Sequence, residues 1–205
     1  MLEILFSAVC FGLTAGLSPG PLLTLVVTET LHHGKIAGMR VALAPVLTDG
    51  PIILVSLFLL SQMTNSNRIL GAISLLGGTF ATFLAIESLR TKGITISIQG
   101  EPPHSLKKGV LVNFLSPHPY IFWMSVGGPL ILHAQQVNKL GGILFIGTFL
   151  AGLVGSKLAL AVVVARSRTF LRGAVYLWTV RVLGIALLVF ATLFFQDALQ
   201  RFELI

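Results

Sequence analysis

Charged side chains are scarce in this sequence. Asp, Glu, Lys and Arg make up 10% of its 205 residues, and hydrophobic residues make up 55%. An ordinary soluble domain has about 25% charged and about 45–50% apolar residues. The composition therefore excludes a soluble protein, and it predicts an all-α integral membrane protein that lies in the lipid bilayer.

Cysteine is nearly absent too, and so are the motifs of several enzyme classes. A single cysteine, Cys10, excludes an intrachain disulfide and a Cys-based metal cluster. The stretch 152–157 only superficially resembles a phosphate-binding loop, because it lacks the required spacing, and the histidines form no metal-binding pair on one helix face. We expect no enzyme activity, no cofactor, no metal site and no ATPase domain. Only an ion gradient would then drive any pumping.

Long windows almost free of charge recur along the chain, and each is near or above the roughly 20 residues that cross the hydrocarbon core as a helix. These six windows are 4–31, 41–60, 69–89, 109–132, 140–165 and 177–195. The polar stretch 91–108 is too short to build a second domain. The sequence predicts one transmembrane domain over 1–205, with six transmembrane helices.

The basic residues are distributed as membrane topology requires, and they do not indicate nucleic-acid binding despite a net charge of +7. Ten of the 14 Lys and Arg residues follow the first, third and fifth windows, whereas three lie on the opposite side and Lys157 falls within a window. By the positive-inside rule, the ten mark the cytoplasmic loops. We expect a multi-pass protein of the plasma membrane with both termini on the outer side.

One motif occurs twice. Leu17-Ser-Pro-Gly-Pro21 returns as Leu115-Ser-Pro-His-Pro119, displaced by 98 residues. The chain is therefore expected to contain two repeats, one at about 1–92 and one at about 108–205, joined by a loop at about 91–108. Three spans in each half reverse the direction of the second half, so the sequence predicts two inverted-topology three-helix repeats.

Inverted repeats with matching interrupted helices are typical of secondary transporters, because an interrupted helix exposes backbone groups near the midplane where a substrate can bind. A proline lacks a backbone donor, and such a break survives in lipid only where protein or a wet cavity satisfies it. The alternative is a pair of plain kinks without a ligand. The candidate substrate-binding residues are Ser18, Pro19, Gly20, Pro21, Asn113, Ser116, Pro117, His118 and Pro119.

Two charges lie well inside predicted spans and away from the span ends, where an unpaired charge costs several kcal/mol. Asp49 and Lys157 occupy corresponding spans of the two halves, and we name them as candidates for proton coupling. They are expected to pair, either as a static ion pair or with Asp49 changing protonation during a cycle. His118 is a second candidate for titration, or a hydrogen-bonded turn residue. Glu29 and Glu87 are interpreted as residues of the span boundaries.

Glycines at positions 12, 16 and 20 form a stripe on one face of the first span. Small residues at this spacing permit close helix contact, so the first span should be central in the bundle.

The sequence resembles the lysine exporter and homoserine/threonine exporter family, the LysE/RhtB-type translocators. The resemblance depends on G-L-S-P-G-P at 16–21, G-K-x-x-G-x-x-x-A at 34–42, Asp49-Gly50, and N-F-L-S-P-H-P at 113–119 followed by aromatics. Two segments depart from the family pattern. The second copy lacks the lysine of N-P-K-x-x-x-F, and Ala-Pro-Val-Leu-Thr replaces the glycine-rich run before Asp49. Both changes alter groups that face the expected cavity.

The resemblance implies export of amino acids or related small metabolites from the bacterial cytoplasm by exchange with protons, and a homodimeric six-helix fold. Two alternatives stay open: export of a divalent metal cation, and a subunit of a membrane complex.

Overall fold

The computed structural model describes residues 2–63, 67–92, 105–166 and 174–202, and within them it contains helices and no strand. The helices of the first half are α1 (Leu2–Leu17), α2 (Pro21–His33), α3 (Lys35–Ala42), α4 (Ala44–Met63) and α5 (Asn67–Arg90). Those of the second half are α6 (Ser105–Leu115), α7 (Pro117–Phe122), the π-helix η1 (Trp123–Gly127), α8 (Gly128–Val137), α9 (Gly141–Arg166) and α10 (Ala174–Arg201).

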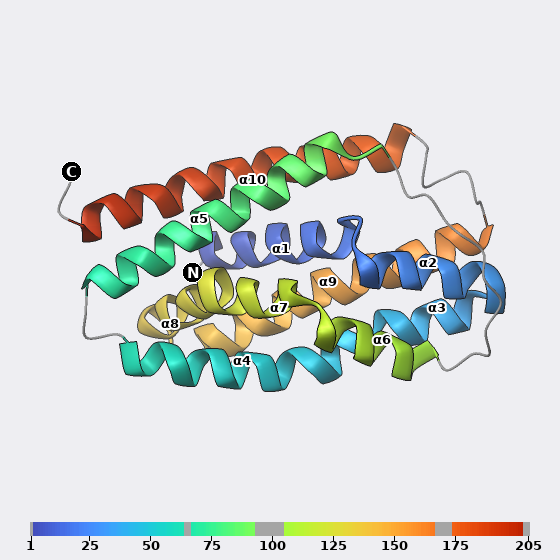
Figure 1. The fold of residues 1–205 in the computed structure, drawn as a ribbon, viewed down its shortest axis with the longest axis horizontal. Helices are drawn as coiled ribbons and strands as arrows, with labels where there is room; N and C mark the ends of the chain where they lie inside the picture. The colour runs from blue at the N-terminus through green and yellow to red at the C-terminus, as the bar shows by residue number, and fades with distance from the viewer. Residues whose placement is uncertain (1, 64–66, 93–104, 167–173, 203–205) are drawn as a thin grey trace.

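The helices lie roughly along one long axis, and both termini lie at the same end of it (Figure 1). From that end, α1 and α2 run to the far end, α3 and α4 return, and α5 runs out again. The second half starts at the far end, where α6, α7, η1 and α8 run back toward the termini, followed by α9 outward and α10 back.

Within the described ranges, four helical segments are long and apolar enough to cross a membrane, namely Lys35–Leu60, Leu70–Arg90, Gly141–Arg166 and Leu177–Arg201. The bent pair α1 and α2 counts as a fifth if it is one span. This agrees with an all-helical membrane protein, but the six predicted spans are not all found. The missing one is 109–132, which the structure divides among α6, α7, η1 and α8. Pro117 begins α7 and Pro129 is the second residue of α8, and no piece reaches the length of a span.

The first proline motif breaks the first span at an angle of 57°. The last regular bond of α1 before the break runs from Ser18 N–H to Thr14 O at 2.7 Å. Pro19 and Pro21 have no N–H to continue that ladder, and Gly20 is extended with φ −143° and ψ 179°. Pro21 then begins α2, where its fixed φ suits the first helical position.

Glycines bring α1 and α9 into close contact. A Cβ at Gly12 would lie 2.5 Å from the carbonyl oxygen of Phe149, and one at Gly16 would lie 2.9 Å from that of Leu153. Gly20 differs, because a Cβ there would meet nothing within 4 Å. The central position expected for the first span is found, since α1 lies between the α5–α10 pair and α9 (Figure 1). The stripe, however, supports packing only at its first two glycines.

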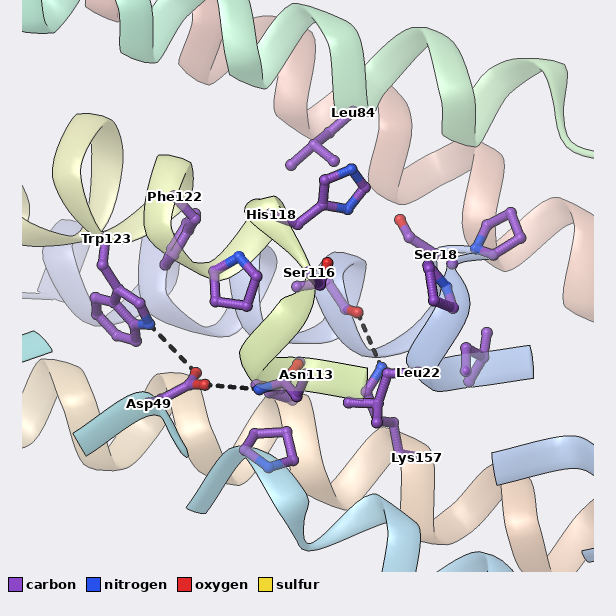
Figure 2. Close-up of a pocket in the computed structure, with 18 of the residues that line it drawn as sticks. Ser18, Leu22, Asp49, Leu84, Asn113, Ser116, His118, Phe122, Trp123 and Lys157 are labelled. Carbon is purple, nitrogen blue, oxygen red and sulfur yellow. Dashed lines mark hydrogen bonds between the residues drawn. The ribbon is translucent and has the colours of Figure 1, made fainter. Parts of the chain in front are cut away.

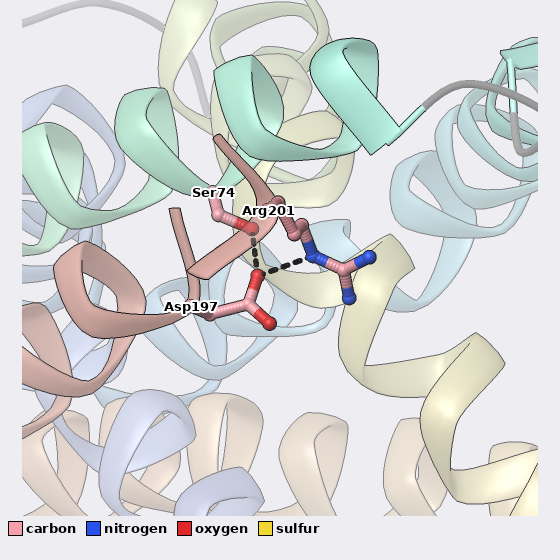
Figure 3. A network of polar contacts seen from close by, with 3 residues as sticks. All are labelled: Ser74, Asp197 and Arg201. Atoms are coloured by element: carbon pink, nitrogen blue, oxygen red, sulfur yellow. Dashed lines mark hydrogen bonds and ion pairs between the residues drawn. The ribbon is translucent and has the colours of Figure 1, made fainter. Parts of the chain in front are cut away.

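Two polar contacts join helices at opposite ends of the bundle. Near the termini, Asp197 of α10 accepts a hydrogen bond from Ser74 of α5 at 2.5 Å and pairs with Arg201 at 2.7 Å (Figure 3). At the far end, Glu29 of α2 accepts a hydrogen bond from Ser105 of α6 at 2.5 Å and lies 3.6 Å from Lys108 Nζ. Glu29 is therefore a buried link between the two halves of the chain.

Candidate functional site

A cavity of about 100 Å³ lies where the two proline breaks meet, and we call it the central cavity. The break between α1 and α2 and the break between α6 and α7 both line it, together with side chains of α4, α5 and α9 (Figure 2). Because one water needs about 10–15 Å³ of such volume, the cavity has room for several waters or for part of a small solute. Two motifs separated by 98 residues in the sequence thus share one cavity.

Asp49 is held at the wall of this cavity by two side chains of the second half. Its side chain is 3% exposed. Oδ1 accepts a hydrogen bond from Asn113 Nδ2 at 3.1 Å, and Oδ2 accepts one from Trp123 Nε1 at 3.2 Å (Figure 2). Asn113 also donates to Thr48 Oγ1 at 2.6 Å. Both carboxylate oxygens are therefore directed by donors, which lowers the cost of placing this group away from water.

The positions of Asn113 and Trp123 follow from the second break. Asn113 lies in the last turn of α6, two residues before the helix ends, and its amide faces α4. Trp123 begins the π-helix η1, and the wider turn of a π-helix changes the direction of the side chains that follow it. Trp123 is not among the site residues predicted from the sequence. The available signal was an indole N–H, a donor that needs a partner when buried, close after a proline motif.

Lys157 extends from α9 to the end of α1. Its side chain is 3% exposed, and Nζ donates to the carbonyl oxygens of Ala15 at 3.1 Å and Gly16 at 2.9 Å. Both Asp49 and Lys157 are within the described residues, and no ion pair within 4.0 Å joins them. The direct pair expected from the sequence is thus absent from the structure, because each group has nearer partners of its own.

The helices that leave the two breaks begin without a side-chain cap. Gly20 precedes α2 and Ser116 precedes α7, and neither provides a side-chain hydrogen bond to the first turn. The Oγ atom of Ser18 is buried and has no hydrogen-bond partner within the described part of the chain. The start of a helix carries a partial positive charge and free N–H groups, which suit a carboxylate.

The carbonyls at the second break have neutral partners. Ser116 N–H bonds to the carbonyl oxygens of Val112 at 3.1 Å and Asn113 at 3.3 Å. The hydroxyl of Tyr120 donates to the carbonyl oxygen of Phe114 at 2.9 Å. The two breaks are therefore alike in sequence but stabilised differently, one by a buried ammonium group and the other by a hydroxyl and a backbone N–H.

His118 and Glu87 line the side of the cavity near α5. The imidazole of His118 packs edge-on against Phe80 and Phe83, with ring centroids 6.2 and 6.3 Å away. The sequence predicts Glu87 as a boundary residue, and in the structure its half-buried side chain also faces the cavity. A wall with one carboxylate and one imidazole can attract a charged solute.

Most of the predicted site residues line the central cavity. They are Ser18, Pro19, Gly20, Pro21, Asn113, Ser116, His118 and Pro119, with Asp49 and Lys157. Pro117 begins α7 at this place, but its side chain lies outside the described residues. The residues missed by the sequence analysis are Trp123 and the apolar walls, including Phe122 and Phe149.

One comparison with known proteins gives a match. The family model described as LysE type translocator matches residues 13–198, which include both breaks and both buried charges. Neither the curated proteins nor the solved structures contain a match to this chain. The family is one of membrane transporters, which agrees with the apolar helices and with the absence of enzyme motifs from the sequence. The chain belongs to the LysE type translocator family.

Proposed function

We propose that this protein is a secondary active exporter of amino acids or related small zwitterionic or cationic metabolites, which exchanges its substrate for protons across the bacterial plasma membrane. The observation that carries the proposal is the shared cavity. Two proline-interrupted helices meet there, beside a buried carboxylate and two uncapped helix starts. Interrupted helices around a midplane site are typical of secondary transporters.

The substrate would bind with its two charged ends in different parts of the cavity. Its carboxylate faces the starts of α2 and α7 and the hydroxyl groups of Ser18 and Ser116, where N–H groups and helix dipoles favour a negative charge. Its ammonium group faces Asp49. The carbonyls of Ala15 and Gly16 are occupied by Lys157, so the carboxylates that remain for the substrate amine are Asp49 and, on the α5 side, Glu87.

Coupling follows from competition for Asp49. A proton and the substrate ammonium group both neutralise this carboxylate, and the two cannot do so together. If the empty carrier returns only with Asp49 protonated, each outward step of substrate is linked to an inward step of a proton. Lys157, whose charge acts on Asp49 without direct contact, assists by holding the end of α1 in place.

The proposed architecture is a pair of inverted three-span repeats with six crossings, counting α6 to α8 as one interrupted span. The path of the chain supports it, because each segment of the first half runs opposite to its counterpart in the second half (Figure 1). The positive-inside rule then assigns the termini to the outer face.

Export of a divalent metal is less well supported. Within the described residues, no three side chains of His, Cys, Asp or Glu come together as a metal site requires. A role as a subunit of a membrane complex has no observation in its favour.

The proposal is tested with the purified full chain in proteoliposomes. Vesicles with an acidic interior should accumulate one class of labelled amino acid from a panel of lysine, arginine, threonine, homoserine and leucine, as protons leave. A protonophore should abolish the accumulation, and protein-free vesicles serve as the control. If no member of the panel accumulates in tight vesicles under either direction of the pH gradient, the amino-acid assignment is wrong.

A further inference from the structure

The end of α1 contains backbone oxygens that regular helix bonding cannot satisfy. The carbonyl of Ala15 would normally bond to the N–H of residue 19, but Pro19 has none. The carbonyl of Gly16 would bond to Gly20, whose extended backbone lies outside the helix. Each orphan carbonyl buried away from water costs free energy unless a donor reaches it.

A buried ammonium group fills this position. Lys157 Nζ lies 2.9 Å from the Gly16 oxygen and 3.1 Å from the Ala15 oxygen. The lysine comes from α9, at the place where the glycine contacts hold α9 against α1. No carboxylate among the described residues lies within 4.0 Å of Nζ. Its ligands are therefore neutral oxygens, as in a binding site for an alkali cation.

A further oxygen is available at the same break. The Oγ atom of Ser18 is buried and has no partner among the residues that the structure describes. A helix end carries a partial negative charge, and its carbonyls, together with unwound backbone, coordinate monovalent cations in secondary transporters. At the second break the Phe114 carbonyl accepts from the Tyr120 hydroxyl, and the Asn113 carbonyl accepts from the Ser116 N–H. Among the described residues, an ammonium group bonds to the carbonyls of the first break and none bonds to those of the second.

We propose that the end of α1 is a binding site for one small monovalent cation or primary ammonium ion, which the protein fills permanently with the side chain of Lys157. This deepens the proposed function, because the site lies beside the substrate cavity and a tethered cation removes the need for a soluble one. Transport should then need no sodium ion. Removing the lysine side chain should expose a site that Na⁺ or methylammonium can occupy.

The experiment measures thermal unfolding of the purified full chain in detergent, and it needs no transport. Lys157→Ala keeps the carbonyl oxygens of the site and removes the ammonium group that fills it. The Tm of this variant should therefore rise saturably with added NaCl or methylammonium chloride. The rise should be about 5 °C or more once the ion concentration is well above its Kd. Tetramethylammonium chloride, which is larger and has no N–H, controls for ionic strength and should have no such effect. The wild-type Tm should not respond to any of the three salts.

Two variants serve as matched controls. Lys157→Met is one atom shorter than lysine and fills most of the space with an apolar group, so neither ion should raise its Tm. Lys139→Ala removes an exposed lysine and should behave as the wild type. The proposal is overturned if Lys157→Ala responds to all three salts equally or to none, because Lys157 is then only a structural cap of α1.

Whether Lys157→Ala folds also tests the proposed cation site. A cell contains monovalent cations, so a true cation site would be occupied during synthesis and Lys157→Ala should be recovered folded. Lys157→Ser, whose side chain ends at the Cγ position of the lysine and does not reach the same carbonyls, provides a second variant with room for an ion. Failure of both variants to fold in salt-containing medium would contradict the proposal. Failure of the amino-acid transport assay would leave these unfolding results unaffected, so the two hypotheses can be rejected separately.

Discussion

The indole nitrogen of Trp123 lies 3.2 Å from Oδ2 of Asp49, and this contact joins the π-helix η1 to α4. It directs the carboxylate toward η1 in the second half of the chain. Loss of a hydrogen bond to a buried group costs about 1–3 kcal/mol when the partner is left unsatisfied. Trp123 is thus a positioning residue for the proposed exchange of proton and substrate.

Trp123→Phe should reduce both stability and transport. The variant removes the N–H while keeping an aromatic ring, so we expect the free energy of unfolding to fall by at least about 1–3 kcal/mol, with further loss from the smaller ring. Substrate exchange in proteoliposomes should show a higher KM. Trp178→Phe is the matched control, since Trp178 is 64% exposed and should change neither quantity. Equal effects of the two variants would show that the contact with Asp49 is unimportant.

Asn113 and Asp49 should be energetically coupled. Asn113→Ala removes the donor to Asp49 Oδ1 and to Thr48, and we expect a loss of about 1–3 kcal/mol in the free energy of unfolding. In a double-mutant cycle with Asp49→Asn, the two losses should differ from additivity by about 0.5–3 kcal/mol, because the residues share one network. Additive losses would indicate that the hydrogen bond contributes nothing measurable.

Gly12→Ala should weaken the contact between α1 and α9. The added Cβ would lie 2.5 Å from the backbone oxygen of Phe149 and 3.2 Å from the nitrogen of Leu153, so the helices must separate. We expect a cost of about 1–3 kcal/mol in the free energy of unfolding. Gly155→Ala on α9 is the control, since a Cβ there meets nothing within 4 Å, and it should be neutral or stabilise by up to about 1 kcal/mol. A neutral Gly12→Ala would show that the close approach is not required.

Much of the site could be predicted from the sequence because its residues are costly in lipid. Prolines inside an apolar span remove hydrogen bonds, and a buried Asp49 or Lys157 needs partners, so these positions stand out without a structure. The repeated proline motif also indicated that the two breaks belong together. Such residues can be recognised from the sequence because lipid penalises their residue types, whatever their packing.

The partners of those residues could not be predicted in the same way. Which atoms Lys157 contacts depends on the rotation of α9 against α1, and that rotation is determined by the glycine contacts between the two helices. Trp123 faces Asp49 from the first position of a π-helical turn, and the sequence has no clear signal for such a turn. The division of the expected fourth span into several helices could not be predicted either. Prolines show where a helix is interrupted, but they do not show how regular the helix is on either side of the interruption.

The role of Asp49 is tested most directly by Asp49→Asn in proteoliposomes, with Asp197→Asn as the matched control because Asp197 lies on α10, away from the central cavity. The variant amide cannot carry the exchanged proton. We predict that Asp49→Asn still exchanges labelled for unlabelled substrate but no longer accumulates substrate when a pH gradient is applied, whereas Asp197→Asn does both. Accumulation by Asp49→Asn at the wild-type rate, with the same dependence on the pH gradient, would contradict the account.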